Sequence, residues 1–141
     1  MPFVVDASVA IQWYVEEPLS LIARQLPRLG EPLYAPDLYL AEMGNIAWKL
    51  AMRGEITTAH ARTIGEVLPR GMPALLASQT FLADALDLSL GLQHPLYDCL
   101  YLACARHLAG RMVTVDGRLL AAVKGTEADP LVCHLRDVVT A

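Results

Sequence analysis

The stretch Phe3-Val4-Val5-Asp6-Ala7-Ser8 decides the fold of this chain. Three apolar residues run directly into a carboxylate and a small hydroxyl residue, and a second apolar run, Val9-Ala10-Ile11, follows at once. This pattern predicts a short buried strand that ends on Asp6. Ligands of open α/β sheets bind outside the carboxyl ends of the strands, so an acid at this place faces a site.

The composition is typical of helices packed on a small sheet. A chain of 141 residues can bury roughly two thirds of its unfolded surface, so we expect one domain that spans residues 1–141. Hydrophobic residues make up 55% of the sequence and aromatic residues only 6%, which favours an α/β protein over a β-sandwich. The mean hydropathy of +0.38 is high for a monomer and predicts a buried subunit interface.

Charge, apolar runs and cysteines exclude several classes of protein. The net charge of -4 argues against a protein that coats nucleic acid, although bound cations can reverse the field around clustered carboxylates. No apolar run reaches the roughly 20 residues that span a bilayer, and the first residues carry no basic signal region. Three cysteines without a Cys-x-x-Cys pair indicate reduced thiols. We therefore expect a cytoplasmic protein with no membrane partner.

The opening pattern recurs near the C-terminus. Residues 112–115 predict a strand that runs into Asp116, and Gly117 and a helical run follow. Apolar runs at 32–35, 72–76 and 131–133 predict further strands. Two strands that end on an acid, in a chain of alternating helices and strands, predict a site at one edge of an α/β sheet.

Two more acids lie in predicted helices. Residues 37–53 predict a long helix whose packing face contains Glu42 and, one turn later, Asn45. A carboxylate on such a face is costly unless it is paired or bound to a cation; an ion pair with Lys49 or a partly exposed edge is the alternative. Asp98 lies in the first turn of a helix that reaches residue 107, where it could also be a simple N-cap.

These four acids together favour a divalent metal site. Carboxylates that converge without basic partners raise one another's pKa values, and bound divalent cations remove this penalty. Hard oxygen ligands suit Mg²⁺ or Mn²⁺, and such ions promote the hydrolysis of phosphodiester bonds. Ser8 and Thr114 would orient the acids or the water, with an N-capping role as the alternative for Ser8. The four acids are Asp6, Glu42, Asp98 and Asp116.

The four acids lie in four short segments, which are, in chain order, Val5-Asp6-Ala7-Ser8, Glu42-Met43-Gly44-Asn45, the run from Tyr97 to Ala103, and the run from Val113 to Leu120. These segments, in this order, resemble the PIN-domain family, and within it the VapC-type toxins of bacterial toxin-antitoxin pairs. Cys99 stands where a small alanine is common, and Gly117 replaces a more usual polar residue. Neither departure removes one of the four acids.

The resemblance implies a three-layer α/β/α fold with a central, mainly parallel sheet of about four or five strands. It implies a metal-dependent endoribonuclease in which Asp6, Glu42, Asp98 and Asp116 hold Mg²⁺ or Mn²⁺. Asn45 and Thr114 match polar positions near the site. A homodimer and a cognate antitoxin protein are also implied, and the chain would meet operator DNA only through that antitoxin.

Two other functions stay open at this point. A non-catalytic PIN-like scaffold that binds proteins would have no reason to retain all four acids. A phosphohydrolase of the haloacid-dehalogenase kind also begins with a strand and an aspartate, but it generally needs a second aspartate where this chain has Ser8. Five basic residues are candidates for contacts with RNA: Lys49, Arg53, Arg111, Arg118 and Lys124.

Overall fold

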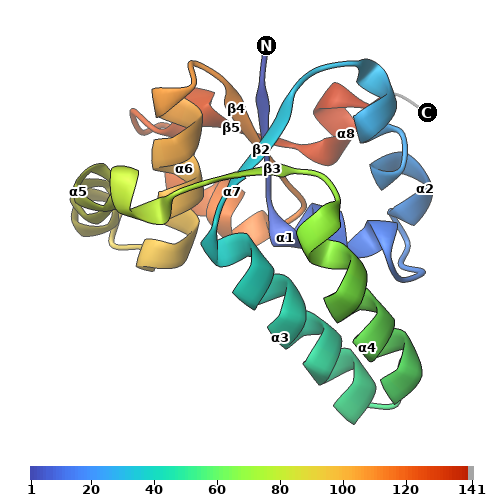
Figure 1. Ribbon diagram of the computed structural model, residues 1–141. Coiled ribbons are helices and arrows are strands. Elements are labelled where there is room, and N and C mark those ends of the chain that lie inside the picture. The colour runs from blue at the N-terminus through green and yellow to red at the C-terminus, as the bar shows by residue number, and fades with distance from the viewer. Residues whose placement is uncertain (140–141) are drawn as a thin grey trace.

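A five-stranded parallel sheet lies at the centre of the protein in the computed structural model, which describes residues 1–139 (Figure 1). The strand order is β3-β2-β1-β4-β5, and all four pairings are parallel. The strands are β1 (Phe3–Val5), β2 (Leu33–Pro36), β3 (Ala74–Leu76), β4 (Arg111–Thr114) and β5 (Val132–His134). The expected sheet of four or five mainly parallel strands is confirmed.

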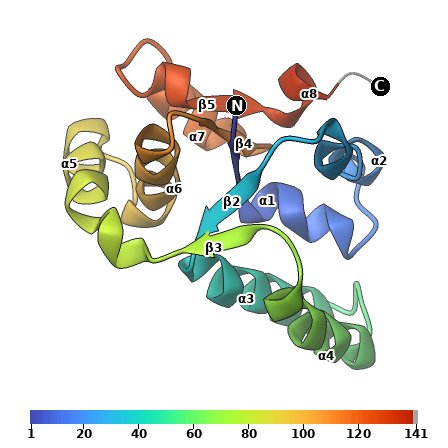
Figure 2. The same cartoon turned by 45° about the horizontal axis from the view of Figure 1, so that its top comes forward.

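Helices cover both faces of this sheet. In Figure 2, α5, α6 and α7 lie on one side of the strands, and α1, α3 and α4 lie on the other. The helices are α1 (Ala7–Ala10), α2 (Ser20–Ala23), α3 (Leu38–Met52), α4 (Thr58–Val67), α5 (Leu82–Leu92), α6 (Leu96–His107), α7 (Gly117–Val123) and α8 (Leu135–Val138). The three-layer α/β/α arrangement is therefore confirmed as well. None of the helices in residues 1–139 is long and apolar enough to cross a membrane.

The first strand lies in the middle of the core. β1 has β2 on one side and β4 on the other, and Val4 and Val5 are completely buried. A strand covered on both faces reads as a continuous apolar run, which explains why the opening stretch does not alternate with polar residues. Helix α6 packs across the same sheet, and its residues 99–105 are all buried.

The carboxyl ends of the parallel strands meet at one edge of the sheet. Helix α1 begins directly after β1, and α7 begins shortly after β4. The backbone N–H of Asp6 donates to the carbonyl of Val113 at 3.0 Å, which continues the β1–β4 pairing up to the acid. The strand-end positions of Asp6 and Asp116 are therefore neighbours in space.

Two local predictions are wrong. The alternative role of Ser8 as an N-cap is wrong, because Asp6 holds the N-cap position and Ser8 lies within α1. The predicted packing face of α3 is also displaced, because Asn45, which was placed on that face, is exposed, whereas Tyr39 and Met43 are buried. The ring of Tyr39 takes the core position that the prediction had given to a neighbouring face of the helix. Glu42 consequently lies at the flank of the buried face and is only partly covered.

Candidate active site

Asp6 is buried at the carboxyl end of β1 and is held by two hydroxyl groups. The side chain of Asp6 is 6% exposed. Ser8 Oγ and Thr114 Oγ1 each donate to Asp6 Oδ2 at 2.7 Å. Both donors use the same oxygen, and within residues 1–139 no hydrogen bond reaches Oδ1. One carboxylate oxygen is therefore fixed, and the other stays available to a ligand.

Burial raises the pKa of Asp6 above its ordinary value of 3.8, because a charge is disfavoured away from water. The hydrogen bonds from Thr114 and Ser8 oppose this shift, since they stabilise the carboxylate. The negative charges of Asp98 and Asp116 raise the pKa further. Asp6 is thus within electrostatic reach of two of the other acids.

Glu42 approaches Asp6 from α3, which lies on the face of the sheet opposite to α6 (Figure 2). It lies in the second turn of α3, and its Oε1 accepts a hydrogen bond of 2.7 Å from the hydroxyl of Tyr101 on α6. Partial burial raises the pKa of Glu42 to about 7, opposed by the Tyr101 hydrogen bond and assisted by the charges of Asp6 and Asp98. The alternative of an ion pair with Lys49 is not realised in the described residues.

Asp98 lies in the first turn of α6 and has a histidine partner. His94 Nε2 is 2.6 Å from Asp98 Oδ2, and their side chains are 13% and 25% exposed. The backbone of His94 is anchored in turn, because Ser89 Oγ donates to its carbonyl at 2.5 Å. Sequence reasoning missed His94 altogether. The spacing of four residues from Asp98 was the one signal that could have identified it.

Asp116 is the N-cap of α7, and its Oδ1 accepts the backbone N–H of Arg118 at 2.9 Å. Thr114 connects this acid to Asp6, because Thr114 Oγ1 donates to Asp6 and accepts the backbone N–H of Asp116 at 3.0 Å. Ser8 belongs to the same network, since its Oγ also accepts the N–H of Val115 at 3.2 Å. These hydroxyls hold the ends of β1 and β4 in register.

The structure thus brings the four predicted acids to one edge of the sheet, from β1, α3, α6 and the end of β4. We call these acids, Asp6, Glu42, Asp98 and Asp116, the acid cluster. No lysine or arginine side chain within residues 1–139 forms an ion pair with any of them. Within the same residues, no three His, Cys, Asp or Glu side chains already form a ready-made metal-binding group.

The donor set of the acid cluster nevertheless fits a hard divalent cation. All four candidate ligands offer carboxylate oxygens, which Mg²⁺ and Mn²⁺ prefer. Asp6 and Glu42 lie in partly or fully buried positions where a positive charge would relieve both the burial cost and the mutual repulsion. The residues present are therefore chemically suited to such an ion.

The remaining predicted residues lie at varying distances from this cluster. Asn45 is exposed on α3 and makes no hydrogen bond to an acid in the described residues, but it lines a hollow together with Glu42. Arg111 starts β4, at the edge of the sheet opposite to the acids, and its Nη2 donates to the carbonyl of Val132 at 3.4 Å. Arg111 therefore lies away from the acid cluster, and its contact with RNA stays a prediction. Lys49, Arg53, Arg118 and Lys124 are exposed.

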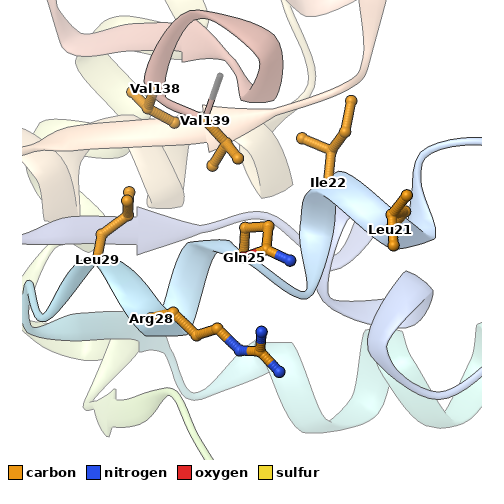
Figure 3. Close-up of a pocket in the computed structure, with 7 residues that line it drawn as sticks. All are labelled: Leu21, Ile22, Gln25, Arg28, Leu29, Val138 and Val139. Carbon is orange, nitrogen blue, oxygen red and sulfur yellow. The ribbon is translucent and has the colours of Figure 1, made fainter. Parts of the chain in front are cut away.

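Another hollow, of about 450 Å³, lies between the α2 region and the C-terminal segment (Figure 3). Leu21, Ile22 and Val138 are among its lining residues, and none of the four acids contributes to it. The lining of this hollow offers no carboxylate to a metal ion, so the hollow is not part of the candidate active site.

Comparison with known proteins agrees with this architecture. The family model of the PIN domain matches residues 3–125. The curated protein "Ribonuclease VapC3" of Pyrobaculum aerophilum is 33% identical over 121 residues, which cover 84% of this chain and 92% of the relative. The crystal structure of PAE2754 from Pyrobaculum aerophilum superposes with a TM-score of 0.69 at 23% identity, covering 98% of this chain and 86% of that chain.

The class of protein follows from the fold, from the family match over most of the chain and from the 33% sequence identity to the relative. The chain belongs to the PIN-domain family, in its VapC-type branch. The segments quoted from the sequence for this resemblance lie within the matched residues 3–125.

Proposed function

We propose that this protein is a metal-dependent endoribonuclease and the toxin of a VapBC-type toxin-antitoxin system, which hydrolyses RNA phosphodiester bonds. The observation that carries the proposal is the acid cluster: four carboxylates converge from four elements, and no basic side chain within residues 1–139 neutralises them. The name of the VapC-type relative supports RNA as the substrate.

In this proposal the acid cluster holds Mg²⁺ or Mn²⁺. When bound, such an ion activates water and offsets negative charge on a phosphodiester. The chain's own residues supply the positioning. Ser8 and Thr114 fix one oxygen of Asp6, Tyr101 fixes one oxygen of Glu42, and His94 fixes one oxygen of Asp98. Each of these contacts leaves the second oxygen of its acid available.

The two alternative functions are less well supported. Ser8, which stands where a haloacid-dehalogenase-like phosphohydrolase generally needs an aspartate, is engaged in hydrogen bonds to Asp6 and Val115. A non-catalytic scaffold would gain nothing from burying Asp6 and Glu42 at the cost of raised pKa values. Both readings leave the convergence of acids without a cause.

The proposed partners follow from membership of the VapC-type branch of the family. They are RNA, which the name of the relative supports, and, from the family resemblance, a cognate antitoxin protein and operator DNA only through that antitoxin. A cytoplasmic location is part of the same proposal, because the three cysteines are buried free thiols, as expected in a reducing compartment.

The proposed homodimer has a candidate surface on α5. Leu82, Leu86 and Leu90 recur every four residues on this helix and are 49%, 49% and 70% exposed. Three leucines in one exposed row are unusual for a free surface and typical of a contact between subunits. Helix α5 packs on α6, so the proposed contact between subunits would stabilise the position of the helix that bears Asp98.

Cleavage of RNA by matched variants tests the proposed function. We expect the wild type to cleave single-stranded RNA in Mg²⁺ or Mn²⁺ and Asp98→Asn to lose this activity. The control is Asp84→Asn, which removes the charge of an exposed aspartate on α5 and should cleave like the wild type. Cleavage by Asp98→Asn at the wild-type rate, or cleavage that survives a chelator, would contradict the proposal.

A further inference from the structure

Two hollows lie near the acid cluster: one of about 360 Å³ has Ser8 and Val115 in its lining, and a second of about 420 Å³ includes Glu42 of the cluster itself. The wall of this second hollow comes from the first two turns of α3 and from the start of α6. Glu42 belongs both to this hollow and to the acid cluster, so the two sites are continuous. We call it the Tyr97 hollow; it is lined by Leu38, Ala41, Glu42, Asn45 and Tyr97.

Tyr97 is exposed although it lies on a mostly buried helix. The side chain is 65% exposed, whereas the residues that follow Asp98 on α6, from Cys99 to Ala105, are all buried. Within residues 1–139 the hydroxyl of Tyr97 makes no hydrogen bond. Its ring forms a wall of the hollow and presents a large flat surface one residue before Asp98.

The lining of the Tyr97 hollow combines three chemical features that suit a nucleobase. The phenol ring of Tyr97 offers a face on which a base can stack. The exposed side-chain amide of Asn45 offers both donors and an acceptor, the pattern that reads the edge of a base. Leu38 and Ala41 add apolar surface, and no lysine or arginine lines the hollow, so it does not suit a phosphate.

We propose that the Tyr97 hollow binds an unpaired nucleobase of the RNA substrate, stacked on Tyr97 and read by Asn45, next to the bond that is cleaved. This inference rests on the proposed function, because a phosphodiester held at the acid cluster brings its own bases to the continuous hollow. A base can stack on a side chain only when it has left the helical stack. The base that occupies the hollow must therefore come from a single-stranded stretch or a loop of the RNA.

Tyr97→Leu and Tyr97→Phe form the matched pair that tests this inference, because only the second variant keeps the ring. We expect Tyr97→Leu to raise KM for a short single-stranded RNA by about tenfold or more relative to Tyr97→Phe, while kcat changes by less than about twofold. Both variants should fold normally, since Tyr97 is 65% exposed.

A second measurement does not depend on cleavage. A fluorescent adenine analogue replaces one base at a time in the same RNA, and binding is followed on the Asp116→Asn background. We expect the fluorescence of the analogue to be quenched at one position when the RNA binds Asp116→Asn alone or combined with Tyr97→Phe. We expect this quenching to be lost when Asp116→Asn is combined with Tyr97→Leu. Quenching without any cleavage by the wild type would support the nucleobase site and refute the proposed function.

Three results would overturn the inference. The first is an equal KM for the two Tyr97 variants of an enzyme that cleaves RNA. The second is RNA that binds, as shown by anisotropy, without quenching at any position. The third is a loss of self-association or of binding to a co-expressed protein in Tyr97→Leu with unchanged RNA cleavage, which would make the hollow a protein contact.

Discussion

Replacing Glu42 with glutamine should stabilise the metal-free protein at neutral and alkaline pH. The glutamine side chain would keep a carbonyl oxygen that accepts the hydrogen bond from Tyr101, which measures 2.7 Å to Glu42 in the wild type. The substitution removes only the negative charge. It therefore isolates the cost of holding a carboxylate at this partly buried place beside Asp6 and Asp98.

The size and sign of the effect follow from the raised pKa of Glu42. The folded protein holds this pKa at about 7, whereas the ordinary value is 4.5. Folding thus favours the protonated carboxyl, so its stabilising contribution is complete below pH 4.5 and is lost as the pH rises through about 7. The difference between the two pKa values corresponds to roughly 3 kcal/mol. Solvent screens part of the charge, so we expect a gain of about 2 kcal/mol above pH 7.

Denaturant unfolding in the presence of a chelator measures this gain across the pH range. The difference in free energy of unfolding between Glu42→Gln and the wild type should be close to zero below pH 4.5 and reach its maximum above pH 7. The control is Glu66→Gln, which changes an exposed glutamate on α4 and should follow the wild type at every pH. A difference that does not change with pH, or a variant less stable than the wild type above pH 7, would refute the reasoning.

Two further outcomes follow from the same site, and a third follows from the proposed dimer surface on α5. Mg²⁺ should raise the melting temperature above pH 7 and lose this effect below pH 4.5, because protons compete for Glu42; an equal thermal shift in both ranges would contradict its role as a ligand. His94→Ala should lower RNA cleavage and Mn²⁺ affinity by about tenfold or more, and His94→Gln, which can still donate to Asp98, should recover part of both; equal values for the two variants would exclude positioning through this hydrogen bond. Leu86→Glu on α5 should convert a dimer to a monomer in light scattering, whereas Leu21→Glu on α2, also an exposed leucine, should not; dimers in both variants would place the interface elsewhere.

The sheet and the acids could be predicted from the sequence because both follow from local order. An apolar run that ends on an acid places that acid at the carboxyl edge of a parallel sheet, and this holds for Asp6 after β1 and for Asp116 after β4. Thr114 could be anticipated for the same reason, because it ends the strand beside β1.

The partners of the acids could not be predicted in the same way. Tyr101 reaches Glu42 across 59 residues of sequence, and its direction depends on how α6 packs over the sheet. The packing face of α3 was misjudged because Tyr39 takes a core position that the polarity of its hydroxyl group argues against. Its hydroxyl is buried without a hydrogen-bond partner in the described residues, an arrangement that no local pattern indicates.

Metal binding by the acid cluster is the central claim, and calorimetric titration with Mn²⁺ tests it most directly. We expect the wild type and the control Asp84→Asn to bind Mn²⁺ with equal affinity, and Asp6→Asn to bind at least about tenfold more weakly. Asp6→Asn should remain folded with equal or higher stability, because a buried charge has been removed. Unchanged Mn²⁺ affinity in Asp6→Asn, or no binding by the wild type, would contradict the account.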